Sequence, residues 1–285
     1  MSLHIENIHA GYGKANVLDD VSLQVSQGCI CALMGRNGSG KTTLMRCINA
    51  MLKPSRGRVT TMGQDITRLS RLEIARLVSI VPQSSDTAFP FSSMEMILMS
   101  CANRIKAWSA PSSREHARAR LVLDELEIGH LSDRPFNQLS GGERQLVMLA
   151  RALFQDTPVM LLDEPNAHLD FAHQHAIMEL MRGVVKKRGV TVLIILHDPN
   201  LVLYYCDRVA MMKKGRIVTE GPTDDVMNDR VLREVLGNGI QMEVTRKGRR
   251  VVTPRARVTK NISLLPDADQ ESEPCDVRTA NGTVS

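Results

Sequence analysis

A glycine-rich loop between an apolar strand and a helical pattern constrains the fold of this chain more than any other feature. The apolar run from Ile30 to Met34 leads directly into the loop G-R-N-G-S-G-K-T, residues 35–42. Apolar residues then recur at helical spacing from Leu44 to Leu52. A strand, a Gly-x-x-x-x-Gly-Lys-Thr loop and a helix in this order predict a phosphate-binding loop in an α/β domain with a mainly parallel sheet.

Each residue type in the loop suits a nucleotide phosphate. Glycines let backbone N–H groups curl around a phosphate, because they have no Cβ atom to clash with it. Lys41 reaches the outer phosphates, and the hydroxyl of Thr42 is a ligand for Mg²⁺. We therefore expect ATP and Mg²⁺ as cofactors.

Two further apolar runs end in polar residues that suit the same chemistry. The run from Val159 to Leu162 ends in Asp163 and Glu164. At the end of a buried strand beside a phosphate loop, Asp163 is expected to hold Mg²⁺. The next residue, Glu164, is expected to polarise the attacking water as a general base.

The second run, from Val190 to Leu196, ends in His197 before Pro199 stops the strand. In open α/β sheets, ligands bind at the carboxyl ends of the strands. His197 is thus placed to donate to the terminal phosphate and to sense whether it is present. The alternative is a histidine that only caps its strand.

A second glycine-containing helix start occurs about a hundred residues after the first. Ser140, Gly141 and Gly142 precede an apolar helical pattern, and the first-turn N–H groups of such a helix attract a phosphate. Since the first loop already surrounds one side of its own nucleotide, this start is explained most simply if it serves the nucleotide of another copy. Two copies related by a two-fold axis would then bury two ATP molecules between them.

Composition narrows the class of protein. No apolar run approaches the roughly 20 residues that a membrane-spanning helix needs, and the N-terminus has no secretory pattern, so we expect a soluble intracellular protein. The formal charge is +5, and residues 245–260 carry seven basic residues and no acid. A solvated surface explains this segment, with anionic lipid or nucleic acid as alternatives.

Cys29 and Cys31 are expected to be small buried hydrophobes. The histidines at 168, 173 and 175 fit a polar helix surface better than a metal site.

These motifs, taken together, resemble those of the ATP-binding cassette (ABC) ATPases over roughly residues 1–240. The loop residues Gly35, Arg36, Asn37, Gly38, Ser39, Gly40, Lys41, Thr42 and Thr43 match the family's Walker A loop. Leu139 to Glu143 match the family's signature loop, Val159 to Glu164 its Walker B strand, and His197 its switch histidine. The resemblance implies that Tyr12 stacks on adenine and that Gln83 contacts the metal and a transmembrane partner. The family often has Ser-Ala-Leu-Asp where this chain has Ala167-His168-Leu169-Asp170, which leaves the role of His168 open.

The resemblance also implies a fold, partners and a location. The fold is a P-loop NTPase (RecA-like) core with an N-terminal antiparallel β portion and a helical ABC-specific subdomain at about residues 84–138. The partners are a second copy of the ATPase, integral-membrane permease subunits and, indirectly, an extracytoplasmic substrate-binding protein. The chain would sit peripherally at the cytoplasmic face of the cell membrane. With one cassette and no internal repeat, we expect no nucleic-acid partner.

The run F-P-F-S-S-M-E-M-I-L-M and the segment before the signature loop are similar to ATPases of metal-chelate importers, which handle ferric siderophores, haem or cobalamin. A molybdate or tungstate importer and a soluble ABC ATPase of iron–sulfur cluster assembly are the alternatives. Met99-Ser100-Cys101 departs from the Gly-Arg that is frequent in this branch, which leaves the docking surface open. Residues 241–265 are expected to form a C-terminal β-hairpin extension around Gly248, and residues 266–285 a polar, disordered tail.

Overall fold

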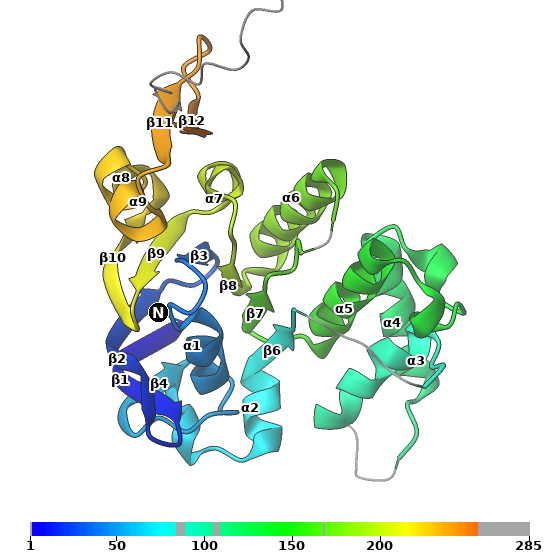
Figure 1. The fold of residues 1–285 in the computed structure, drawn as a ribbon. Helices are drawn as coiled ribbons and strands as arrows, with labels where there is room; N and C mark the ends of the chain where they lie inside the picture. The colour runs from blue at the N-terminus through cyan, green and yellow to red at the C-terminus, as the bar shows by residue number, and fades with distance from the viewer. Residues whose placement is uncertain (1, 84–88, 105–108, 168, 256–285) are drawn as a thin grey trace, which may run out of the picture. The chain divides into compact units, whose positions relative to one another are not determined.

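The computed structural model describes residues 2–83, 89–104, 109–167 and 169–255, in which two larger sheets and a hairpin are combined with helices (Figure 1). The strands are β1 Leu3–Tyr12, β2 Ala15–Val25, β3 Ile30–Met34, β4 Arg56–Thr61, β5 Gln64–Asp65, β6 Val78–Val81, β7 Val159–Asp163, β8 Thr191–Ile195, β9 Arg208–Lys213, β10 Arg216–Pro222, β11 Ile240–Val244 and β12 Arg250–Pro254. The α-helices are α1 Lys41–Ile48, α2 Arg71–Leu77, α3 Ser93–Leu98, α4 Ser113–Glu125, α5 Gly141–Gln155, α6 Phe171–Arg188, α7 Pro199–Tyr205, α8 Thr223–Val226 and α9 Asp229–Leu236. Short 3₁₀ turns are η1 Ile66–Arg68, η2 Met99–Asn103, η3 Gly129–Leu131 and η4 Phe136–Gln138.

The central sheet has six strands in the order β10-β9-β3-β8-β7-β6. All neighbouring pairs are parallel except β9 and β10, which are antiparallel. Strands β3, β7 and β8 are buried along their whole length, which explains their unbroken apolar runs. Since the strands are parallel, β6, β7, β8 and β3 end at one edge of the sheet.

Alternating side chains divide the core between the two faces of this sheet. Ala32 and Leu162 belong to a cluster shared with α5, α6 and α7, whereas Leu33 and Leu161 belong to a cluster shared with α1 and the N-terminal strands. The second sheet, in the order β2-β1-β4-β5, is antiparallel. The predicted α/β core and N-terminal antiparallel portion are therefore present.

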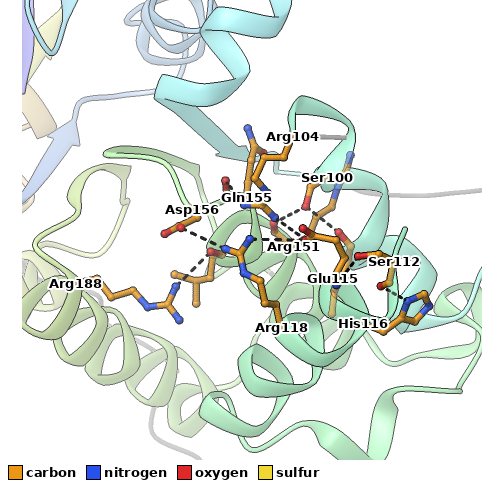
Figure 2. A network of polar contacts seen from close by, with 12 residues as sticks. Ser100, Arg104, Ser112, Glu115, His116, Arg118, Arg151, Gln155, Asp156 and Arg188 are labelled. Carbon is orange, nitrogen blue, oxygen red and sulfur yellow. Dashed lines mark hydrogen bonds and ion pairs between the residues drawn. The ribbon is translucent and has the colours of Figure 1, made fainter. Parts of the chain in front are cut away.

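A polar network connects α4 and Arg104 to the C-terminal end of α5 in the region between β6 and β7. Arg104 Nη1 donates to the backbone oxygen of Gln155 at 3.0 Å, and Arg118 forms a 3.3 Å ion pair with Asp156. Glu115 lies between the two arginines, 3.5 Å from Arg104 and 3.8 Å from Arg118. Figure 2 shows these side chains joining α4 to the segment between α5 and β7. The C-terminal end of α5 is therefore held against α4 and Arg104.

Local details differ from the sequence expectations at two places. The helix after the glycine loop ends at Ile48, because Asn49 caps it and Ala50 has a left-handed φ of 55°; Leu52 lies beyond the helix but still packs against the core. The hairpin of β11 and β12 begins at Ile240, one residue before the expected extension. Residues 256–265 of that expected extension, the expected tail at 266–285 and His168 lie outside the described residues. Among the described helices, none has the length and apolar character to cross a bilayer.

Candidate nucleotide-binding site

The glycine loop connects β3 to α1 in a conformation that only glycine tolerates at its two ends. Gly35 has φ +156°, and a Cβ atom there would lie 2.2 Å from the backbone oxygen of Met212. Gly40 has φ +105° and begins α1, where a Cβ atom would lie 2.8 Å from Leu18. The backbone of the loop is thus packed tightly against β9 and β2, which fixes where its N–H groups lie.

Lys41 is turned back over this loop. Its Nζ donates to the backbone oxygens of Gly35 at 2.8 Å and Arg36 at 3.2 Å, and the residue is only 6% exposed. Burial lowers the pKa of Lys41, and the negative charges of Glu164 and Asp163 oppose that shift. A buried ammonium whose hydrogen bonds among the described residues go to neutral carbonyls is suited to an anionic partner, which fits the role predicted for this lysine.

Asp163 and Thr42 form an oxygen pair at the end of β7. The hydroxyl of Thr42 is hydrogen-bonded to the Asp163 carboxylate, while Asp163 Oδ1 is buried and has no hydrogen-bond partner among the described residues. Burial raises the pKa of Asp163, and the neighbouring charge of Glu164 raises it further. A hard cation with oxygen ligands would compensate this carboxylate, so the donor set fits Mg²⁺.

Gln83, Glu164 and His197 meet beside the loop. Gln83 Nε2 donates to Glu164 Oε2 at 2.7 Å, and His197 Nε2 lies 2.6 Å from Glu164 Oε1. Each residue follows the carboxyl end of a parallel strand, namely β6, β7 and β8, so neighbouring strand ends bring them together. Glu164 has a left-handed φ of 52°, an unfavourable backbone conformation for a non-glycine residue that is often found at functional sites.

A cavity of about 550 Å³ joins the loop to this polar cluster. The residues that line it come from the loop, the start of α1, the polar cluster and β2: Asn37, Gly38, Gly40, Lys41, Thr42, Thr43, Gln83, Glu164, His197 and Val17. The predicted residues Lys41, Thr42, Gln83, Glu164 and His197 therefore line one cavity, whereas Asp163, Gly35, Arg36, Ser39 and Tyr12 are not part of its lining. A volume of this size is typical of small-molecule sites.

Ser140, Gly141 and Gly142 do not line this cavity. Ser140 is the N-cap of α5: its hydroxyl accepts from the backbone N–H of Glu143 at 3.3 Å, and Glu143 accepts from the backbone N–H of Ser140 at 2.7 Å. Arg134 pairs with Glu143 at 2.6 Å. The capping box stabilises the start of α5. Within a single chain, this helix start is not part of the cavity beside the phosphate loop.

Sequence reasoning missed two residues near the site. Arg46 donates to the hydroxyl of Tyr12, a residue that is 44% exposed, at 2.8 Å. The sequence signal for Arg46 was its position one helical turn after Thr42, on the same face of the helix. Asn166 is buried, and neither polar atom of its side chain has a partner among the described residues. The sequence signal for Asn166 was only its place two residues after Glu164.

A family model described as ABC transporter matches residues 18–167, more than half of the chain. The chain belongs to the ABC transporter family. The protein is accordingly an ATPase of that family. The match includes the phosphate loop, the helix start at Ser140 and the acidic end of β7.

Two similar proteins have names that refer to iron chelatin transport and to hemin import. A Helicobacter pylori protein named as an iron chelatin transport ATP-binding protein is 36% identical over 228 residues, which cover 80% of this chain and 89% of the relative. The hemin import ATP-binding protein HmuV of Nocardia farcinica is 37% identical over 233 residues, covering 81% and 80%.

Solved structures support the same family. The chain is similar to a metal-chelate type ABC transporter solved in an inward-facing conformation, with a TM-score of 0.79, 26% identity and coverage of 90% of this chain and 98% of the other. A dimeric ABC cassette bound to ADP and Pi has a TM-score of 0.69, 27% identity and coverage of 78% and 98%. The ABC cassette fold expected from the sequence is confirmed.

Proposed function

We propose that this chain is the ATP-hydrolysing subunit of an importer for a metal chelate, such as a ferric siderophore, haem or cobalamin. The names of the relatives supply the cargo class, because iron chelatin, hemin and metal-chelate transport recur among them. The observation that carries the ATPase function is the contact of Glu164 with both Gln83 and His197 beside the phosphate loop.

In this proposal the loop residues bind and orient the triphosphate. Lys41 leaves the carbonyls of Gly35 and Arg36 and turns its ammonium toward the outer phosphates. Thr42, Asp163 and Gln83 would hold Mg²⁺ through their side-chain oxygens. The ion, when bound, neutralises phosphate charge and so lowers the barrier to phosphoryl transfer.

Glu164 is the general base in this proposal. Its carboxylate accepts a proton from the attacking water, while Gln83 and His197 hold the carboxylate in place through its two oxygens. When nucleotide binds, His197 would donate to the terminal phosphate in place of Glu164, so it reports on whether hydrolysis has occurred. Tyr12, exposed at the end of β1, stacks on the adenine base.

A second copy completes each site. Ser140, Gly141 and Gly142 offer first-turn N–H groups but do not line the cavity of their own chain. In a two-fold dimer they would bind the nucleotide held by the phosphate loop of the other copy. The similarity to a dimeric ABC cassette supports this arrangement.

The importer reading also implies partners and a location. In the same proposal, this chain is attached peripherally at the cytoplasmic face of the membrane and binds permease subunits. An external substrate-binding protein delivers the cargo to those subunits. The helical region, within the proposed subdomain at residues 84–138, would dock on the permease. The iron–sulfur assembly and molybdate alternatives are not favoured by the relatives' names.

The test uses the full chain co-expressed with its candidate permease. Mg-ATP hydrolysis and uptake of a ferric siderophore or haem are measured in vesicles for the parent and for Glu164→Gln. The isosteric change removes the base, so hydrolysis and uptake should fall about 100-fold or more while ATP still binds. Glu179→Gln, the same change on an exposed part of α6, is the matched control and should behave as the parent.

Either of two results would contradict the proposal. Hydrolysis by Glu164→Gln at the parent rate would remove the general base. Absence of any integral-membrane protein from detergent-extracted complexes would remove the importer role and return the soluble alternative.

A further inference from the structure

Arg46 links the adenine end of the proposed site to the phosphate end. It lies on α1, where only Thr42 and Arg46 are exposed and the remaining side chains of the helix are buried. Thr42 and Arg46 are four residues apart, so they share one face of the helix. Tyr12 belongs to a different element, the last residue of β1, beside an open turn at Gly13 with nothing within 4 Å of a Cβ atom there.

The contact between Arg46 and Tyr12 has a defined geometry. Arg46 Nη1 donates to the Tyr12 hydroxyl at 2.8 Å, and the guanidinium carbon lies 5.8 Å from the ring centroid. That distance is near the outer limit of about 6 Å for a cation over a ring. The guanidinium therefore bonds to the hydroxyl of Tyr12 and does not lie closely over its ring. The face of the ring stays accessible to the base of a nucleotide.

We infer that Arg46 is a positioning residue that holds Tyr12 in the orientation in which its ring stacks on the nucleotide base. The inference rests on the proposed function, since it assumes that Tyr12 contacts the base. Because α1 also carries Lys41 and Thr42, one rigid helix fixes the spacing between the base platform and the phosphate loop. Without the hydrogen bond from Arg46, the side chain of Tyr12 at the end of the hairpin would be free to change its rotamer. Nucleotide binding would then have to restrict that side-chain motion, which costs binding free energy.

Two other roles for Arg46 must be separated from this one. A cation in the last turn of α1 stabilises the helix dipole. The charge of Arg46 also lowers the pKa of Asp163, which would affect metal binding. Neither of these roles depends on the base or on the hydroxyl of Tyr12.

The test compares Mg-ATP with Mg-tripolyphosphate, which has the phosphates but no base. Binding is measured by calorimetry on the full chain, and KM and kcat for ATP are measured on the assembled complex. Arg46→Met should raise the Kd and KM for Mg-ATP on the order of fivefold and leave the Kd for Mg-tripolyphosphate unchanged. Tyr12→Phe should produce the same change, and the double variant should bind no more weakly than either single variant. Arg46→Lys, which keeps the charge but loses the planar fork, should recover part of the affinity.

Equal weakening of ATP and tripolyphosphate, or multiplying effects of Arg46→Met and Tyr12→Phe, would overturn the inference. Arg68→Met, at an exposed arginine outside the site, serves as the control for general effects of removing a surface charge. A parent protein that binds neither Mg-ATP nor Mg-tripolyphosphate would refute the proposed function itself. A parent that binds both, with Arg46→Met indistinguishable from it, would refute only the role of Arg46.

Discussion

Replacing Asp163 by asparagine should stabilise the protein without nucleotide and remove its response to Mg-ATP. Asp163 is 7% exposed, and its Oδ1 atom has no hydrogen-bond partner among the described residues. The change Asp163→Asn keeps the shape and removes the buried charge. Burying a charged carboxylate costs more than burying the neutral amide that replaces it, and the gain from removing the charge should be about 1–3 kcal/mol. For a chain of this size, 1 kcal/mol corresponds to about 2 °C in Tm, which predicts a rise of about 2–6 °C.

The pH dependence has a definite sign. Burial raises the pKa of Asp163 above its ordinary value of 3.8, so the folded state binds this proton more tightly than the unfolded state does. The cost of the charge is absent below pH 3.8, grows as the pH rises toward the raised pKa, and is fully present above it. The advantage of Asp163→Asn should therefore be complete at neutral pH and should shrink as the pH falls toward 4.

The assay is thermal unfolding with and without Mg-ATP. At 100 times its Kd, a ligand adds about 2.7 kcal/mol to the parent, or about 5 °C. Asp163→Asn should lose most of this increment, while the exposed control Asp225→Asn should keep it. A lower Tm for Asp163→Asn without nucleotide, or a full Mg-ATP increment, would refute the assignment of Asp163 as a buried metal ligand.

Two further changes test the loop and the second helix start. Lys41→Ala removes the buried ammonium over Gly35, so Mg-ATP binding should weaken about 100-fold or more in calorimetry; an unchanged Kd would remove Lys41 from the phosphate site. Ser140→Arg should leave nucleotide binding to the monomer intact and stop hydrolysis. Because Ser140 also caps α5, the variant loses about 1 kcal/mol of helix stability. Ser70→Arg removes an equivalent capping box at α2 and should keep hydrolysis at the parent rate. Loss of hydrolysis in both serine variants would mean that the cap, and not the nucleotide, explains the effect.

The sequence predicted the strands that carry the site because their signals are local. The apolar runs before Gly35, Glu164 and His197 are buried strands, as expected for a parallel sheet covered on both faces. Their polar ends could be placed at one edge from strand direction alone. The side-chain contact of Glu164 with both Gln83 and His197 could not, since it depends on strand order and on the backbone conformation of Glu164.

Tertiary contacts account for what the sequence did not predict. Helical periodicity extended the helix after the loop to Leu52, but the left-handed backbone at Ala50 ends it earlier. The contact of Arg46 with Tyr12 joins residues 34 positions apart on two different elements. A serine at position 140 and a glutamate at position 143 are the sequence signature of a capping box. The adjacent glycines favoured the prediction of a phosphate-binding helix start instead.

The structure of the Glu164→Gln variant with Mg-ATP tests most directly whether two polypeptides share each nucleotide. Our account predicts a two-fold dimer with two triphosphates, each contacted by Lys41 of one chain and by Ser140 of the partner subunit. A bound triphosphate contacted by Lys41 and Ser140 of the same polypeptide, or a monomer with ATP fully enclosed, would contradict it.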